Sequence, residues 1–431
     1  MAIMALFISA IPPLVAASDD YAALFQQAAA LSQQGKYELA AEKYEAALRL
    51  RPGSAEALNN VAVMYYEAHR YQDAFAAASQ IWRSHPELKS AALIAGLAAV
   101  QSNRPGEALA PLEKLVAAEP SNRDALLGLA SAHLQMKDVA RAAELYVREI
   151  ENDPRDVNAW YGKAICYERM AEDASRKLSR MPGGTSYSKR LLAEYLQGTG
   201  DGKLAAEAFG ESLATESTSS AKANREYETA RDLAAKSRDS FEQLVSLAPD
   251  SWQASLFLGD VERQHGSFSA ALEHYQKTAE LQPENAAPLL GMGTVYWEMG
   301  NFDRAVTCLR EALKFKPDSM QAIFELANIA VRRHQDAAAI PLLRQYLATQ
   351  PDAAAARIDL GRAYFHLGQF EKAVEAFTSA LDSDEKGDVH YQLATALRKL
   401  GRMSEAETAM RESNVLRKAE LKREQELHSR N

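Results

Sequence analysis

Small, apolar and polar residues recur along this chain with a period of 34 positions, and a proline stands near the end of most periods. The prolines form two series: Pro52, Pro86, Pro120 and Pro154, followed by Pro249, Pro283, Pro317 and Pro351. A fixed period of this length is typical of stacked helical hairpins. The pattern predicts an all-α solenoid of about nine repeats, each made of two antiparallel helices.

Three further positions of the period support this frame when the proline is counted as position 32. Position 8 is always Ala or Gly, as at Ala28 and Gly293, and position 20 is Ala in eight repeats, as at Ala305. Small residues there let the two helices of a hairpin approach closely. Position 24 usually has a large apolar residue such as Tyr44, and position 15, where the first helix must end, is often Gly.

The run Leu289, Gly293, Tyr296, Ala305 and Pro317 resembles the consensus of the tetratricopeptide-repeat family. The resemblance covers about residues 21 to 414 and recurs at nine registers. It implies helix pairs stacked into a right-handed superhelix with a concave face, and that face is where we expect partners to bind.

An insertion of 61 residues interrupts the period between Pro154 and Pro249. Its residues keep the spacing of one degenerate repeat: Ala193, Leu196, Gly200, Ala205 and Phe209. We predict that both helices of the fifth repeat run beyond their usual length and carry a small helical hairpin. The insertion is either a decoration of the scaffold, or a partner site or hinge between two half-arrays.

The first 17 residues contain no charged side chain and end in Val15-Ala16-Ala17, which suits cleavage by signal peptidase before Ser18. We therefore expect an exported, periplasmic or otherwise extracytoplasmic protein. The segment lacks the usual basic residue, so an upstream start, a hydrophobic cap on the first repeat and a cytoplasmic location stay open. The predicted organisation is a signal peptide at 1–17, an N-terminal array at 18–170, the insertion at 171–224, a C-terminal array at 225–414 and a polar capping helix or tail at 415–431.

The charge of the chain narrows the range of partners. The net charge is −9 and charged residues make up 25% of the sequence. Nucleic-acid binding needs a basic stripe that neutralises phosphates, so this balance argues against it. Cys166 and Cys308 lie in different repeats, too far apart along a solenoid for a disulfide.

No catalytic motif stands out. The nine His residues form no metal-ligand spacing with Cys or Asp, and the chain has no phosphate-binding loop and no nucleophile elbow. We therefore expect no enzymatic activity, no cofactor and no metal.

The groove is the informative surface. In the tetratricopeptide-repeat family, positions 2, 5, 9 and 12 of the first helix tend to face the concave side, and here positions 5 and 12 are mostly apolar. The candidate groove residues are Phe25, Tyr66, Leu93, Tyr161, Trp297, Phe324 and Phe365. Position 5 is also half core in any such repeat, so a purely structural role stays open.

The resemblance implies a non-enzymatic scaffold that binds a peptide or helix of a partner protein in this apolar groove. The alternative is a membrane-associated assembly or secretion factor of the cell envelope, which would belong to a peripheral membrane complex. The partner's identity and the oligomeric state are left open by the sequence.

Overall fold

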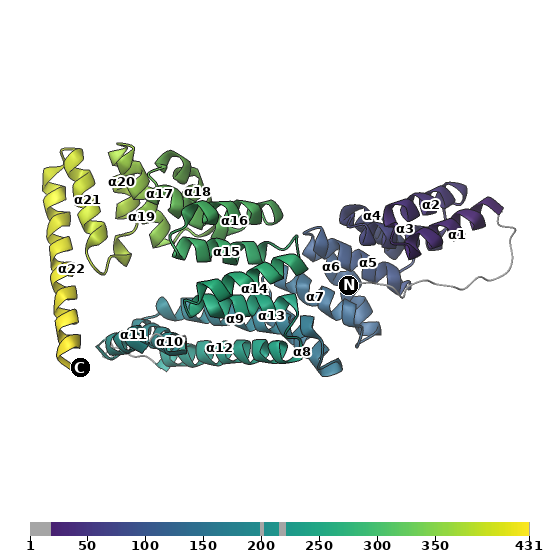
Figure 1. Cartoon of the computed structure of the whole chain (residues 1–431), viewed down its shortest axis with the longest axis horizontal. Coiled ribbons are helices and arrows are strands. Elements are labelled where there is room, and N and C mark those ends of the chain that lie inside the picture. The colour runs from purple at the N-terminus through teal and green to yellow at the C-terminus, as the bar shows by residue number, and fades with distance from the viewer. Residues whose placement is uncertain (1–18, 199–201, 215–220, 431) are drawn as a thin grey trace. The chain divides into compact units, whose positions relative to one another are not determined.

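The computed structural model describes residues 19–198, 202–214 and 221–430, and within them it contains α-helices and one short 3-10 helix but no strand (Figure 1). The expected signal segment, residues 1–17, therefore lies outside the described residues. The predicted all-α solenoid is confirmed, because the helices pair as successive antiparallel hairpins. The chain divides into two compact units, Met1–Met181 with Ala221–Ala248, and Pro182–Ser220 with Pro249–Asn431.

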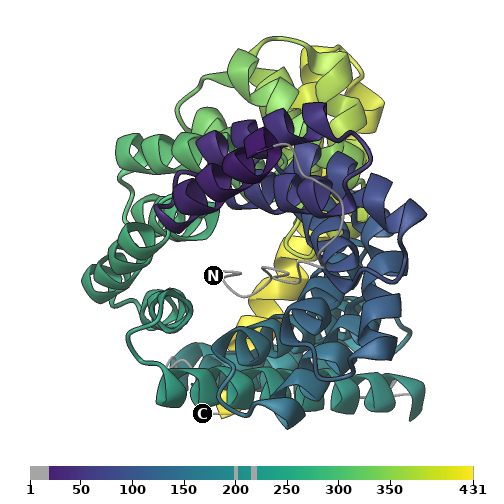
Figure 2. The ribbon, with the colours of Figure 1, turned by 90° about the vertical axis from the view of Figure 1, so that its right-hand side faces the viewer.

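Unit 1 contains four complete hairpins and a fifth with long helices. Its helices are α1 Asp19–Gln33, α2 Tyr37–Leu50, α3 Ala55–Glu67, α4 Tyr71–Ser84, α5 Lys89–Gln101, α6 Pro105–Ala118, α7 Arg123–Gln135, α8 Val139–Asn152, α9 Val157–Ser179 and α12 Ala221–Leu247. Figure 2 shows these hairpins following one another from purple through blue to teal.

Unit 2 contains the hairpin of the insertion and the second series of repeats. Its helices are α10 Gly184–Gly198, α11 Gly202–Ala214, α13 Trp252–Gln264, α14 Phe268–Leu281, α15 Ala286–Glu298, α16 Phe302–Phe315, α17 Met320–Arg332, α18 Asp336–Thr349, α19 Ala354–His366, α20 Phe370–Thr378, the 3-10 helix η2 Leu381–Ser383, α21 Asp388–Lys399 and α22 Met403–Arg430.

The repeated polar residue two places after the proline explains where first helices begin. In six repeats its side chain caps the helix by accepting a hydrogen bond from a backbone N–H of the first turn: Ser54, Asn122, Asp156, Ser251, Asn285 and Ser319. Such a cap satisfies one of the N–H groups that lack a partner within the helix. Helix starts are therefore determined locally, repeat by repeat.

In the repeats of regular length, the turn between the two helices of a hairpin has a left-handed residue at position 15. Glycine fills this place in several repeats, for example Gly300 with φ 73°. In other repeats a larger residue adopts the same conformation, as His69 does at φ 58° and His334 at φ 55°. Glycine adopts positive φ without steric cost, so the non-glycine residues are tolerated at the turn rather than required by it.

The core follows the small and large positions of the period. Tyr275 is fully buried at position 24, and a Cβ added at Gly259, position 8 of the same repeat, would lie 2.7 Å from its ring. The same relation joins Leu112 to Gly96 and Leu309 to Gly293. Large side chains of second helices therefore fill the space left by small residues of first helices, as the sequence predicts.

The predicted extension of the fifth repeat is confirmed, because α9 and α12 have 23 and 27 residues, against 13 and 14 in most other repeats. The two long helices pack against each other, and the Ser237 hydroxyl donates a 3.0 Å hydrogen bond to the Ala164 carbonyl. The expected boundaries of the insertion, 171 and 224, consequently fall inside these helices.

The hairpin of α10 and α11 keeps only part of the degenerate repeat. Ala193 and Ala205 are buried, but Phe209 at the filling position is 46% exposed. Ala208 and Ser212 face inward in its place, since they share the inner side of α11 with Ala205 at helical spacing. Gly200 of the predicted pattern lies outside the described residues.

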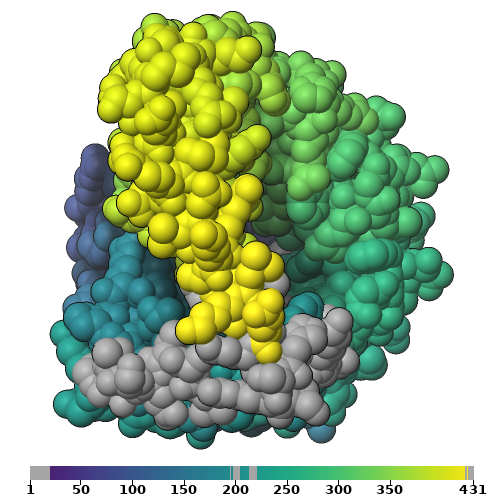
Figure 3. Space-filling view, turned by 90° about the vertical axis from the view of Figure 1, so that its left-hand side faces the viewer, coloured from purple at the N-terminus to yellow at the C-terminus, as the bar shows by residue number. Residues whose placement is uncertain are grey.

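The last helix, α22, continues the final hairpin and includes the expected capping segment. It pairs with α21, and Figure 3 shows it in yellow at the surface of unit 2. Val415, in the part beyond the repeat, is 60% exposed. Among the described residues, every helix falls short of the length and apolarity needed to cross a membrane.

Candidate functional site

Each unit has a face built from the first helices of its hairpins. In unit 1, α3, α5, α7 and α9 contact one another in sequence, and in unit 2 α13, α15, α17 and α19 do the same. We call these surfaces the unit 1 face and the unit 2 face. All seven candidate groove residues lie on first helices, four in unit 1 and three in unit 2.

The unit 1 candidates differ in how accessible they are. Phe25 is half-buried, with its ring centroid 4.9 Å from that of Tyr44. Leu93 is only 5% exposed and belongs to the core. Leu93 therefore contributes to packing, which is the purely structural role that was left open for residues at position 5.

The two tyrosines of the unit 1 face are half-buried. The Tyr66 ring meets that of Tyr71 edge-on at 5.4 Å, and burial raises the pKa of the Tyr66 hydroxyl. The Tyr161 ring lies 6.2 Å from that of Phe241 on α12. Both rings are therefore held by aromatic neighbours while part of each side chain stays accessible.

The three unit 2 candidates follow one another on α15, α17 and α19 and are also half-buried. The Phe324 ring stacks on Tyr346 at 4.7 Å, and the Phe365 ring meets Phe370 edge-on at 5.4 Å. Phe324 and Phe365 therefore each pack against the second helix of their own hairpin.

Trp297 is fixed by the next repeat. Its indole Nε1–H donates a 3.3 Å hydrogen bond to Asn328 Oδ1, and the Arg332 guanidinium lies 5.5 Å from its ring. Asn328 in turn donates to Asp359 Oδ2 at 3.0 Å, one repeat further along. The orientation of this indole therefore depends on a chain of polar contacts across three successive first helices.

These contacts belong to a larger set that the sequence interpretation missed. We call it the polar ladder; it comprises Asp260, Arg263, Thr294, Glu298, Glu325, Asn328, Asp359 and Arg362. Position 9 of four consecutive repeats supplies Asp260, Thr294, Asn328 and Arg362. All four are polar where the corresponding residues of unit 1 are mostly apolar. Position 9 was expected to face the concave side, but its residues were not compared between the repeats, so this signal was missed.

Burial changes the pKa of two carboxyl groups of the ladder. Desolvation raises the pKa of Glu325, although Gln321 and the Thr294 hydroxyl donate hydrogen bonds to it. Desolvation likewise raises the pKa of Asp260, against the opposing effect of a 2.6 Å hydrogen bond from the Tyr275 hydroxyl. The unit 2 face thus combines a packed polar surface with the aromatic residues that the sequence placed there.

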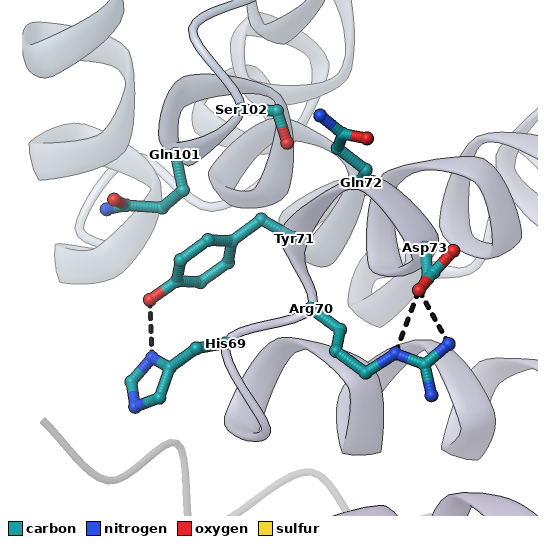
Figure 4. A pocket seen from close by; sticks show the side chains of 7 residues that line it. All are labelled: His69, Arg70, Tyr71, Gln72, Asp73, Gln101 and Ser102. Carbon is teal, nitrogen blue, oxygen red and sulfur yellow. Dashed lines mark hydrogen bonds and ion pairs between the residues drawn. The ribbon is translucent and has the colours of Figure 1, made fainter.

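A surface pocket lies at the turn between α3 and α4, lined by residues 69–73 together with Gln101 and Ser102 (Figure 4). His69 Nδ1 is 2.6 Å from the Tyr71 hydroxyl, and Arg70 pairs with Asp73. These contacts join neighbours in the sequence and give no sign of a bound ligand, although the buried Ser102 hydroxyl of the lining has no hydrogen-bond partner among the described residues.

The two thiols are poor nucleophiles. Burial raises the pKa of Cys166 to about 12 and also raises the pKa of Cys308. A thiolate is the reactive form of cysteine, so neither side chain is suited to covalent chemistry near neutral pH.

Comparisons with known proteins agree with this architecture. A family model described as tetratricopeptide repeat matches residues 25–87, 95–157, 219–286, 324–388 and 358–413, and a second model of that description matches residues 262–328. No curated protein sequence matches the chain.

Solved structures similar to this chain include MamA, residue 41 to its end, from Desulfovibrio magneticus RS-1. It is 25% identical, the match covers 39% of this chain and 96% of that one, and the TM-score is 0.37. MamA AMB-1 C2221 is 26% identical over 38% and 96% of the two chains, with a TM-score of 0.36. The family models together match more than half of the sequence, so the chain belongs to the tetratricopeptide-repeat family.

Proposed function

We propose that this protein is a non-enzymatic scaffold whose unit 2 face binds a segment of a partner protein, as a helix or an extended peptide. Membership of the tetratricopeptide-repeat family supports the general role of a protein-interaction scaffold. The observation that carries the finer proposal is the placement of Trp297, Phe324 and Phe365 on three successive first helices, each half-buried and held by neighbours.

Aromatic side chains in such a setting suit recognition. Large rings dominate the energetics of protein interfaces, and a ring that is already fixed loses little conformational entropy when a partner docks. Trp297 is held in this way by Asn328 and Arg332.

The polar ladder complements the rings chemically. It alternates donors such as Arg263 and Arg362 with acceptors such as Glu298 and Asp359. A peptide segment offers apolar side chains for the rings and backbone N–H and C=O groups for the ladder. We therefore favour a polypeptide partner of mixed polarity over a purely apolar one.

The test compares two paired variants with a matched control in the full-length protein. The first is a double variant of the unit 2 face, with Trp297→Ala and Phe365→Ala. The second is a double variant of the unit 1 face, with Tyr66→Ala and Tyr161→Ala. The control is Phe315→Ala, an aromatic residue that is 45% exposed at the end of the second helix α16. Circular dichroism first establishes that each variant is folded.

Partners are captured from native cells, identified by mass spectrometry, and then titrated as purified proteins against each variant. The proposal expects at least one partner whose direct binding weakens in the Trp297 and Phe365 variant and is unchanged in Phe315→Ala. Loss only in the Tyr66 and Tyr161 variant would move the site to unit 1. If both face variants still bind the partners as the wild type does, the proposal is contradicted. Co-fractionation of the protein with membranes would favour the role of an envelope assembly factor.

We also propose that the protein is exported, on the strength of the uncharged residues 1–17 and their small-residue ending. Amino-terminal sequencing of the protein from its native cells tests this. A mature chain that begins at Ser18 supports export, whereas an intact Met1 contradicts it.

A further inference from the structure

Two histidines and an aspartate from adjacent repeats of unit 2 converge at one place. His334 lies in the turn between α17 and α18, Asp336 is the first residue of α18, and His366 is the last residue of α19. A ligating atom from each of the three lies within 4.8 Å of the other two. We propose that these residues form a binding site for a divalent transition-metal ion, with Zn²⁺ as the expected occupant.

The distances suit such an ion. His366 Nδ1 lies 3.1 Å from Asp336 Oδ1, and the two imidazole centroids are 5.1 Å apart. A zinc ion with bonds of about 2.0 Å in tetrahedral geometry holds its ligand atoms about 3.3 Å from one another. The exposed His334 ring therefore needs only a small side-chain rotation to complete the set.

The chemistry of the donors selects the class of metal. Two imidazole nitrogens and one carboxylate oxygen suit zinc, copper or nickel, whereas magnesium and calcium prefer oxygen ligands alone. Three protein ligands leave a further position for water or for a side chain of a bound partner.

The burial of Asp336 provides a second observation. Asp336 is 3% exposed, and among the described residues its ion-pair partner is the His366 imidazole. A buried carboxylate is unfavourable without a positive partner. The nearby Arg333 does not supply one, because its guanidinium pairs with Asp303 at 2.9 Å. A metal ion held by Asp336 and both histidines would supply the missing charge.

The backbone at His334 does not explain why a histidine is there. The residue adopts φ 55° at the turn position that Gly266, Gly300 and Gly368 fill in other repeats of the same unit. The sequence interpretation found no metal spacing, because it looked for ligands close together in sequence. Here His366 follows Asp336 by 30 residues, and only the stacking of two repeats brings them together.

The test is a Zn²⁺ titration of untagged, metal-free, full-length protein in competition with a chromophoric chelator. We expect each wild-type chain to bind one zinc ion tightly. His334→Gly should weaken this binding by about tenfold or more. Glycine suits this turn, so His334→Gly removes the ligand and retains the fold. His366→Gln and Asp336→Asn should weaken binding similarly.

Two histidines serve as matched controls. His69→Gly makes the same change at the same turn position in unit 1, where the histidine faces Tyr71. His390→Gln disrupts a His–Asp pair of unit 2, in which His390 Nδ1 lies 2.7 Å from Asp384. Neither substitution should alter the affinity for the tightly bound zinc ion.

Thermal unfolding gives an independent readout. Zn²⁺ should raise the melting temperature of the wild type and of both controls, since it would bind only the folded arrangement that joins α18 to α19. The same addition should raise the melting temperature of His334→Gly clearly less. The proposal is overturned if the wild type binds no zinc ion tightly, or if His334→Gly retains wild-type affinity.

Discussion

Replacing Gly291 by alanine should destabilise unit 2 even though alanine is the better helix former. Gly291 lies on α15, and a Cβ added there would be 2.5 Å from Tyr275 Cε1 of the preceding repeat. The ring has little room to move, because Tyr275 is 0% exposed and its hydroxyl donates to Asp260 at 2.6 Å. On the other side, the ring fills the space above Gly259.

The size of the effect follows from two opposing contributions. Alanine in place of glycine within a helix is favourable by about 1 kcal/mol. Forcing an extra methyl group into a filled core costs about 1 to 3 kcal/mol, and the confined ring places this site at the upper end. The expected net loss of unfolding free energy is therefore about 2 kcal/mol.

The assay is urea unfolding of the full-length protein followed by far-ultraviolet circular dichroism. The control is Gly106→Ala in the first turn of α6, where the glycine is exposed and, apart from its chain neighbours and the local helix backbone, nothing lies within 4 Å of the added Cβ. Here only the helix propensity changes, so stability should rise by up to about 1 kcal/mol. The same substitution should thus have opposite signs at the two sites.

A Gly291→Ala protein as stable as the wild type would refute the reasoning, because it would show that the Tyr275 ring can yield. A double-mutant cycle with Tyr275→Leu gives a further check. The smaller side chain should relieve the clash, so the two substitutions together should cost less than the sum of their separate effects.

Three other predictions follow from individual contacts. Burial raises the pKa of Glu325 above its ordinary value of 4.5, so the folded state binds more protons than the unfolded state and stability falls as the pH rises through the folded pKa. Urea midpoints should be measured across pH. The stability of Glu325→Gln relative to the wild type should increase towards neutral pH, and the difference between the two proteins should disappear in acid. The Cys166 thiol, with a pKa of about 12, should react with a thiol reagent only after denaturation; rapid labelling of the native protein at Cys166 would contradict its burial. Asp156→Ala should lower stability by about 1 to 2 kcal/mol, because it removes the cap of α9 and the ion pair with Arg123. Asp156→Asn retains the cap and should lose less stability. Equal urea midpoints for the wild type and both variants would exclude both roles of Asp156.

Much of the fold could be predicted because its determinants are local. The cap at Ser319, the left-handed turn at Gly300 and the pairing of Leu309 with Gly293 each involve residues within one repeat. The same local rules predicted the long helices on either side of the insertion. They failed at Phe209, where the partner helix determines which side of α11 is buried.

The sequence by itself therefore determined the repeat, its helix boundaries and the first helices on which the candidate aromatic residues lie. Only the tertiary structure decided that Leu93 is core, that a polar ladder crosses the unit 2 face, and that His334, Asp336 and His366 meet. The physical reason is the distance along the sequence over which each interaction acts. Helix propensity, capping and turn conformation act over a few residues, whereas the ladder contacts join residues about one repeat apart, and their geometry depends on how neighbouring hairpins pack.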